Sequence, residues 1–268
     1  MTRLAELDAD TARNWIGRWD RQQEVYLPDR EERFTALIDA VEAGAGRPDP
    51  LVIDLGCGPG SLAARLLDRL PAATVVAVDA DPVTLALGRA AYAGRPGLRF
   101  ADVDLRVPGW ESGLGLSPGQ QADAVVSTTA LHWLTGPELR ALYEALGILL
   151  HRGGLFLDGD HLRLHQGSAP VLAAIERALE EREGLRRFPD GHAGRADDWA
   201  QWWLAATADP ALTDAAAERA KRGLGACDHS QADGVRLDTH VSALRAAGFA
   251  EVGTIWQRGG NRLLCAVR

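Results

Sequence analysis

The sequence is poor in cysteine, methionine and lysine, and it has no long apolar run. Its 268 residues include one methionine, and Lys221 is the only lysine. The three cysteines, Cys57, Cys227 and Cys265, are odd in number and far apart, which argues against a disulfide framework and a Cys-x-x-Cys metal site. No apolar run approaches the roughly 20 residues of a membrane-spanning helix, and the polar N-terminal stretch does not resemble a signal peptide. We therefore expect a reducing, cytoplasmic location and no membrane partner.

Basic charge is also scarce relative to acidic charge. The chain carries 29 Lys and Arg residues against 37 Asp and Glu residues, a formal net charge of −8. A negative surface gives no general attraction to nucleic acid, so we expect no nucleic-acid partner. With 46% hydrophobic and 25% charged residues, the composition is ordinary for a globular protein. We expect a single domain over residues 1–268, and the sequence leaves a homodimer open.

Short apolar segments alternate with helical segments over the first 160 residues. Apolar residues three and four positions apart indicate an amphipathic helix at 30–44, after a helical segment at 2–26. The expected strands are 51–55, 74–79, 98–105, 122–128 and 155–160. The helices expected between them are 61–70, 81–92 and 137–150. This alternation is typical of a mostly parallel sheet with helices on its faces.

The regular alternation stops after residue 160. Residues 161–236 are far longer than a usual connection and are rich in helix formers. We expect this segment to form a helical cap rather than an independent domain. Its expected helices are 170–183, 197–207 and 210–222. A helix at 238–247 then leads to strands 250–256 and 262–268, and the short Gly-rich turn between these strands predicts an antiparallel hairpin.

The stretch LVIDLGCGPG, residues 51–60, places three glycines directly after an apolar strand, which lets a ligand come close to the backbone. No Gly-Lys-Ser/Thr closes this turn, so a nucleoside-triphosphate P-loop is excluded. The dinucleotide pattern G-x-G-x-x-G is incomplete, because the glycines are Gly56, Gly58 and Gly60 and Ser61 stands where the third glycine belongs. Glycine spacing alone therefore does not decide which nucleoside ligand is bound.

Three acidic residues stand at or near the ends of the first three expected strands. Asp54 precedes the glycines, where a carboxylate could orient the loop or meet a cationic ligand group. Asp79 is placed to accept hydrogen bonds from two ribose hydroxyls. Asp102 is placed to accept from an exocyclic amine, with Val103 beside it as an apolar contact for a ring. A ligand with an amino-acid end, a ribose and an adenine fits all three positions.

These motifs occur with others in an order that resembles a known family. DLGCGPG, VDADP, FADVDL and DAVVSTTALHWL, followed by a C-terminal hairpin, resemble class I S-adenosylmethionine-dependent methyltransferases. ALHWL and the N-terminal WDRQQEVY are similar to the small-molecule branch that includes trans-aconitate methyltransferase-like enzymes. The resemblance implies an α/β, Rossmann-like seven-stranded sheet of order 3-2-1-4-5-7-6 with strand 7 antiparallel, and a helical cap insertion after strand 5.

The same resemblance implies S-adenosyl-L-methionine as the cofactor. The residues expected to hold it are Asp54, Gly56, Cys57, Gly58, Gly60, Asp79, Ala80, Asp102, Val103 and Ser127. Nucleic-acid amino-methyltransferases of this fold carry an Asn/Asp-Pro-Pro-aromatic stretch after strand four, where this chain has Ser-Thr-Thr-Ala, so we expect a small-molecule acceptor. The Lys–Asp–Asn metal set of catechol-type enzymes is not recognisable, so no metal is expected.

Histidine is the natural candidate for a catalytic base, because its side chain titrates near neutrality. His132 follows the fourth expected strand and His161 the fifth, and we favour His161 slightly. A base is needed only where the acceptor must lose a proton, and alignment alone can suffice for an ionised carboxylate.

Aromatic residues are candidates for contacts with the acceptor. Residues 1–45 are expected to form an N-terminal helical lid that carries Tyr26, and the alternative is a helix that simply packs on the edge of the sheet. Trp199 and Trp203 share one helix face with Trp202, a stripe that suits either core packing or the wall of an apolar pocket. We list Tyr26, Trp199 and Trp203 as candidate substrate contacts.

The expected function is methyl transfer to oxygen, carbon or nitrogen of a partly apolar small molecule. The alternative is a protein that keeps this fold without methylating, such as a cyclase-like catalyst or a cofactor-binding regulatory subunit. A nicotinamide dehydrogenase is disfavoured by the glycine spacing and by the closing antiparallel hairpin.

Overall fold

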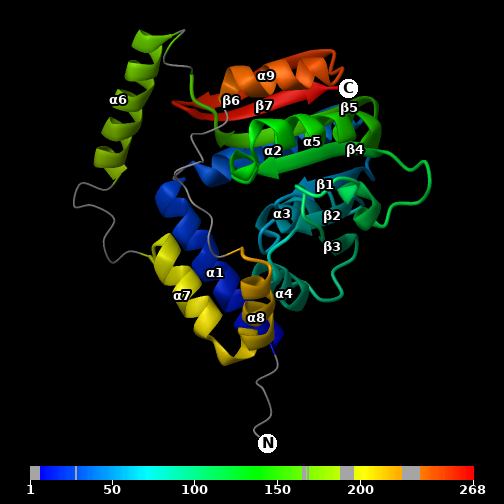
Figure 1. Ribbon diagram of the computed structural model, residues 1–268, viewed down its shortest axis with the longest axis vertical. Helices are drawn as coiled ribbons and strands as arrows, with labels where there is room; N and C mark the ends of the chain where they lie inside the picture. Colours follow the sequence, from blue (N-terminus) through cyan, green and yellow to red (C-terminus); the bar gives the residue numbers. More distant parts are fainter. Residues whose placement is uncertain (1–6, 28, 165–166, 168, 188–195, 225–235) are drawn as a thin grey trace, which may run out of the picture.

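The computed structural model describes residues 7–27, 29–164, 167, 169–187, 196–224 and 236–268. At its centre is a seven-stranded sheet of order β3-β2-β1-β4-β5-β7-β6 (Figure 1), the order expected from the family resemblance. Its strands are β1 (Leu51–Leu55), β2 (Thr74–Asp79), β3 (Leu98–Asp102), β4 (Ala122–Thr128), β5 (Leu150–His161), β6 (Glu251–Arg258) and β7 (Asn261–Val267).

The strands β1 to β5 run parallel, and their carboxyl ends meet at one edge of the sheet. Leu55 of β1 pairs with Val78 of β2 on one side and with Ser127 of β4 on the other. Asp79 of β2 pairs with Asp102 of β3. β7 runs antiparallel to both β5 and β6, which confirms the predicted hairpin. In open parallel sheets, ligands bind outside this carboxyl edge.

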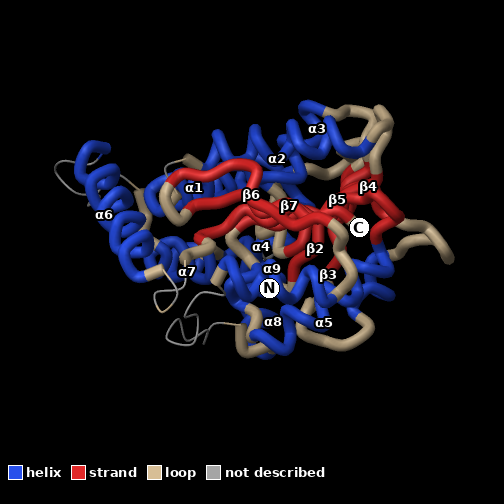
Figure 2. The backbone as a smooth tube through the Cα atoms, turned by 90° about the horizontal axis from the view of Figure 1, so that it is seen from above, coloured by secondary structure: helices blue, strands red, loops and turns tan. Residues whose placement is uncertain are grey.

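Helices cover both faces of the sheet (Figure 2). On one face, Leu37 of α2 (Arg30–Ala45) and Leu66 of α3 (Ser61–Arg69) are buried in a common cluster with β4. On the other face, Leu146 of α5 (Gly136–Leu149) and Leu244 of α9 (Leu237–Ala246) are buried in a cluster with Phe156 of β5. Burying one such leucine side chain contributes about 1.5–3 kcal/mol, so these apolar faces fix the helices on the sheet.

A third apolar cluster joins the N-terminal helix to the segment after β5. Trp202 of α7 (Trp199–Ala208) is fully buried in a cluster with Trp15 of α1 (Ala9–Tyr26) and Leu87 of α4 (Pro82–Ala91). The Trp15 indole nitrogen also donates to Asp209, at 2.8 Å. α8 (Thr213–Lys221) packs against α4, and Figure 1 shows α1, α7 and α8 side by side. These helices form one packed layer.

α6 (Pro170–Arg187) lies apart from α7 and α8 (Figure 1). Glu176 of α6 pairs with Arg262 of β7, and the Glu180 carboxylate accepts from the backbone nitrogen of Gly260 at 3.0 Å. The described residues of the segment after β5 thus include helices that pack in two separate places. Parts of the predicted cap, 165–166, 168, 188–195 and 225–235, lie outside the described residues.

Among the described residues, the structure contains no helix long and apolar enough to span a membrane.

Candidate active site

A cavity of about 760 Å³ opens at the carboxyl edge of the parallel strands. Of the residues singled out in the sequence, it is lined by Asp54, Gly56, Cys57, Gly58, Asp79, Ala80, Val103, His132, Trp199 and Trp203. Among the described residues, its lining does not include Gly60, Asp102, Ser127 or His161. The side chain of Tyr26 lies outside the described part of the structure. One cavity thus brings together most of the predicted cofactor residues, one predicted base and two predicted substrate contacts.

Each of the three loop glycines adopts a left-handed backbone conformation, with φ of 65° at Gly56, 54° at Gly58 and 88° at Gly60. A Cβ on Gly56 would lie 2.3 Å from the Cβ of Ala130, and one on Gly60 would lie 2.8 Å from the ring of Phe100. Both distances are shorter than van der Waals contact, so these two positions require glycine for space as well as for φ. Gly60 therefore affects the loop through its backbone conformation and its close approach to Phe100.

Asp79 fastens the glycine loop to the end of β2. One carboxylate oxygen accepts from the backbone nitrogen of Gly58 at 2.7 Å, and the other accepts from that of Asp81 at 2.8 Å. Burial raises the pKa of Asp79 to about 6, although these backbone donors act in the opposite direction. Asp79 is thus part of the loop architecture, in addition to any contact that it makes with a ligand.

Asp54 is fully enclosed, and its Oδ2 has no hydrogen-bond partner within the protein. Burial, together with the charge of Asp79, raises its pKa to about 8. A buried carboxyl without a cation keeps its proton, and an approaching cation would favour the ionised form. A contact with a cationic ligand group was one of the two roles considered for Asp54 from the sequence, and the other was to orient the loop. Ser127, by contrast, donates its hydroxyl to the Leu55 carbonyl inside the sheet.

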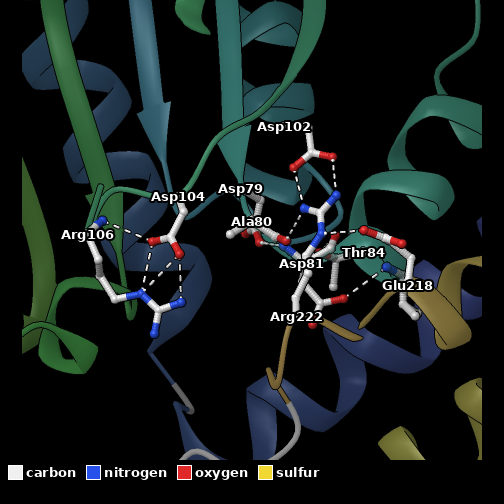
Figure 3. A network of polar contacts seen from close by, with 10 residues as sticks. Asp79, Ala80, Asp81, Thr84, Asp102, Asp104, Arg106, Glu218 and Arg222 are labelled. Carbon is white, nitrogen blue, oxygen red and sulfur yellow. Dashed lines mark hydrogen bonds and ion pairs between the residues drawn. The ribbon is translucent and has the colours of Figure 1, made fainter. Parts of the chain in front are cut away.

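Asp102 is held by an arginine that the sequence did not suggest (Figure 3). Arg222, just after α8, donates from Nη1 to Oδ1 of Asp102 at 2.6 Å and from Nη2 to Oδ2 at 2.9 Å. The same Nη1 reaches the Ala80 carbonyl at 3.0 Å, and Nε contacts Glu218 at 3.1 Å. Both carboxylate oxygens of Asp102 are therefore engaged, although the residue was expected to face an exocyclic amine.

His132 faces the cavity and is paired with a buried carboxylate. Its Nδ1 lies 2.7 Å from Oδ2 of Asp160, and its side chain is 30% exposed, against 3% for Asp160. Burial by itself would lower the pKa of His132, but the Asp160 carboxylate outweighs it and the pKa is raised. For Asp160, burial is likewise outweighed by His132 and Arg33, which lower the pKa to about 2. The two groups form an oriented His–Asp pair.

His161 has a different environment. Its backbone nitrogen donates to Oδ1 of Asp160 at 2.7 Å, whereas its Nδ1 is buried without a hydrogen-bond partner. Burial lowers its pKa. His161, which was slightly favoured as the base from the sequence, is not among the described residues that line the cavity, whereas His132 is.

Two other buried polar residues, Arg33 and Asp158, interact electrostatically with Asp160 of the His132–Asp160 pair. Arg33 is completely buried, and its Nη1 donates to Asn261 at 2.8 Å. It crosses β5 over Gly159, where a Cβ would come within 2.9 Å of the arginine side chain. Asp158 is also fully buried, and burial together with the charge of Asp160 raises its pKa well above the ordinary value. Of the two neighbouring carboxyls, Asp160 therefore carries the charge that faces His132.

The three tryptophans on one face of α7 lie in two different environments. Trp202 is core, whereas Trp199 and Trp203 line the cavity beside Trp19 of α1. The Trp19 ring lies 5.5 Å from that of Trp199, centroid to centroid, and its edge lies over Gly58 of the loop. The cavity therefore has an aromatic wall built from the N-terminal helix and the segment after β5.

Two further cavity residues were missed in the sequence. Arg30, at the start of α2, is 4% exposed and pairs with Asp20 at 2.9 Å, and its Nη1 has no hydrogen-bond partner. Thr129, directly after β4, has a φ of 51°, an uncommon value for a β-branched residue. No local pattern marks Arg30, because only the packing of α1 and α2 brings it to the cavity. Among the described residues, no group of three or more His, Cys, Asp or Glu side chains is arranged to hold a metal ion.

Comparison with known proteins identifies the family. Residues 52–154 match a family model described as a methyltransferase domain. Trans-aconitate 2-methyltransferase of Deinococcus radiodurans is 31% identical over 211 residues, which cover 78% of this chain and 70% of that protein. The same-named protein of Escherichia coli O45:K1 is 30% identical over 135 residues, and the chain spans about half of its length, 49%.

Solved structures agree with the fold. Magnesium protoporphyrin IX methyltransferase from Synechocystis, with bound S-adenosylhomocysteine, has a TM-score of 0.50 and 18% identity, and the match covers 93% of both chains. Human N-acetylserotonin methyltransferase, in complex with S-adenosylmethionine, has a TM-score of 0.51 and 16% identity over 94% of this chain and 56% of that one. The chain belongs to the class I S-adenosylmethionine-dependent methyltransferases, the class named for that cofactor.

Proposed function

We propose that this protein transfers the methyl group of S-adenosylmethionine to a partly apolar small molecule, and that His132 is the base where the acceptor must lose a proton. The observation that carries the proposal is the single cavity in which the glycine loop, the His132–Asp160 pair and the tryptophan wall meet. Clefts of this size, mostly apolar with a few placed polar groups, are typical of small-molecule sites.

The cofactor half of the cavity offers complementary groups for each part of S-adenosylmethionine. Asp54, whose Oδ2 has no hydrogen-bond partner, suits the ammonium group of the methionine end. Arg30, whose Nη1 has no hydrogen-bond partner and lies 3.6 Å from a Glu31 carboxylate oxygen, suits its carboxylate. Asp79 at the end of β2 suits the ribose hydroxyls, and Val103 suits the adenine ring. When bound, the cofactor supplies an electrophilic methyl group on a sulfonium.

Among the described residues, the acceptor half of the cavity is lined mainly with aromatic rings. Its wall includes Trp19, Trp133, Trp199 and Trp203. Two arginines of the lining other than Arg30 already contact carboxylates, Arg106 with Asp104 and Arg219 with Asp81. A tricarboxylate would have to displace these pairs, whereas a flat or partly apolar hydroxyl compound would not. This favours a different acceptor from the one in the relatives' names.

Most of the rate is expected to come from alignment, because methyl transfer from a sulfonium is an in-line displacement. Asp160 holds Nδ1 of His132, which leaves Nε2 to receive a proton from the acceptor. The helices of residues 1–45 and 161–236 are proposed to exclude water from the cavity.

Cys57 and Cys265 are free thiols, which agrees with a cytoplasmic location.

The test uses S-adenosylmethionine labelled in its methyl group, with a panel of phenols, aromatic amines, monocarboxylates and trans-aconitate. We expect label in an aromatic hydroxyl or a related partly apolar acceptor, and little in the tricarboxylate. The proposal is wrong on the acceptor if only the tricarboxylate is labelled. If S-adenosylhomocysteine binds but no acceptor takes label, the alternative of a non-methylating protein with this fold is favoured.

A further inference from the structure

Arg222 engages Asp102, the strand-end acid that was expected from the sequence to bind the cofactor. Asp102 ends β3, the position from which a carboxylate would accept the exocyclic amine of an adenine, and its two oxygens receive Nη1 and Nη2 of Arg222 (Figure 3). A guanidinium fork takes one lone pair of each oxygen and offsets the carboxylate charge, so an amine that approaches Asp102 from the same side must displace the fork. The guanidinium therefore takes the place of an amine ligand on Asp102.

The rest of α8 is held independently of this pair. Arg219, one turn earlier, pairs with Asp81 at 2.6 Å and lies 3.8 Å from the centre of the Trp203 ring. Its side chain is 16% exposed, whereas that of Arg222 is 33% exposed. Arg222 also keeps Glu218 as a partner on its own helix, at 3.1 Å. The Arg222 side chain can therefore leave Asp102 by rotating toward solvent, while α8 stays in place.

We propose that Arg222 is a built-in competitor for the nucleoside end of the cofactor, displaced from Asp102 when the adenine amine binds. This inference rests on the proposed function. The release also frees the Ala80 carbonyl, which Arg222 contacts at 3.0 Å beside the ribose-side residue Asp79. Because the pair is exposed to solvent on one side, its cost to ligand binding is small but measurable.

The proposal makes Arg222 weaken cofactor binding, which is the opposite of what a ligand-contacting arginine does. Exposed pairs contribute in the range that corresponds to about a two- to five-fold change in an equilibrium constant. Arg222→Gln should therefore bind S-adenosylhomocysteine about two- to five-fold more tightly than the wild type. Salt screens the Arg222–Asp102 pair, so wild-type affinity should rise between about 0.05 M and about 0.5 M NaCl, and that of the variant should not.

The experiment is isothermal titration calorimetry of the full chain with S-adenosylhomocysteine. Lys221→Gln is the matched control, because it removes the same charge from the adjacent residue, which is 76% exposed and pairs with Glu218 rather than with Asp102. We expect its affinity to equal that of the wild type. In an Asp102→Asn background, the gain from Arg222→Gln should disappear, because the competition then has no acceptor.

The possible outcomes separate this inference from the proposed function. If the wild type does not bind S-adenosylhomocysteine at all, the proposed function fails. If the wild type binds it and Arg222→Gln binds equally or more weakly, only the competitor role is overturned, and a weaker variant would make Arg222 part of the ligand site. A gain shared by Lys221→Gln would show a general charge effect and would also overturn it.

Discussion

Replacing Asp160 with asparagine tests the proposed role of His132 as the base. The substitution removes the negative charge beside His132 but keeps the side-chain shape and an oxygen that can accept from Nδ1. The two groups are 2.7 Å apart, and Asp160 is 3% exposed, so solvent screens the pair poorly. The effect should therefore appear in the chemistry rather than only in the stability of the fold.

The magnitude follows from the contact. Two unit charges at 2.7 Å interact by about 1.5 kcal/mol even in bulk water, and a hydrogen bond to a charged group contributes about 1.5–3 kcal/mol. If the proton leaves the acceptor in the rate-limiting step, losing this support should lower turnover by about 10- to 150-fold. Asp160 raises the pKa of His132, so its loss lowers that pKa. The acidic limb of the pH–rate profile should therefore move to lower pH.

The assay is the rate of labelled methyl transfer at saturating cofactor as a function of pH. His161→Gln is the matched control, since His161 adjoins Asp160 on β5 but is not among the described residues lining the cavity. We expect its profile to match the wild type and S-adenosylhomocysteine affinity to be unchanged in both variants. An unchanged profile for Asp160→Asn, or an equal loss in His161→Gln, would refute the proposed role of the His132–Asp160 pair.

Three further predictions follow from the cavity. Gly56→Ala should abolish S-adenosylhomocysteine binding and lower the melting temperature, because its Cβ would lie 2.3 Å from a neighbouring side-chain carbon. The control Gly46→Ala has a similar φ of 66° and open space around it, so it should lower the melting temperature without affecting binding in a titration. Binding of S-adenosylhomocysteine near pH 7 should release a proton from Asp54, because the pKa of about 8 falls when the ligand's ammonium group arrives. Calorimetry in buffers of different ionisation enthalpy should detect this proton release, and Asp54→Asn should not show it. Trp203→Ala should raise the KM for the acceptor with little change in folding, whereas replacing the fully buried Trp202 with alanine should cost about 3–5 kcal/mol of stability. Equal effects of both variants on the melting temperature would contradict the assignment of Trp202 to the core and Trp203 to the cavity wall.

The fold was predictable because its signals are local. Apolar runs of five to seven residues gave β1, β2 and β4 with the bounds that the structure shows, and the alternation with helices gave the parallel sheet. β3 ends at Asp102, earlier than predicted, and residues 103–106 line the cavity instead of continuing the strand. The short 3₁₀ helix Trp110–Leu114, between β3 and β4, was not predicted from the sequence.

The site was predictable only where its residues follow the strands. The three glycines and Asp79 carry signals of position and residue type, and the structure places them around one loop. The Asp102–Arg222 contact joins residues 120 positions apart, so no spacing rule could have given it. Which of the two histidines lines the cavity depends on side-chain direction. Successive residues of β5 point to opposite faces of the sheet, so Asp160 contacts His132 while His161 lies on the other face.

The most direct test of the account is a crystal structure of the protein with S-adenosylhomocysteine. We predict the amino-acid end between Asp54 and Arg30, the purine beside Val103, and the sulfur facing the part of the cavity that holds His132 and the tryptophans. A ligand bound outside the glycine loop, or one whose sulfur points away from His132, would contradict the central claim that this cavity carries out methyl transfer.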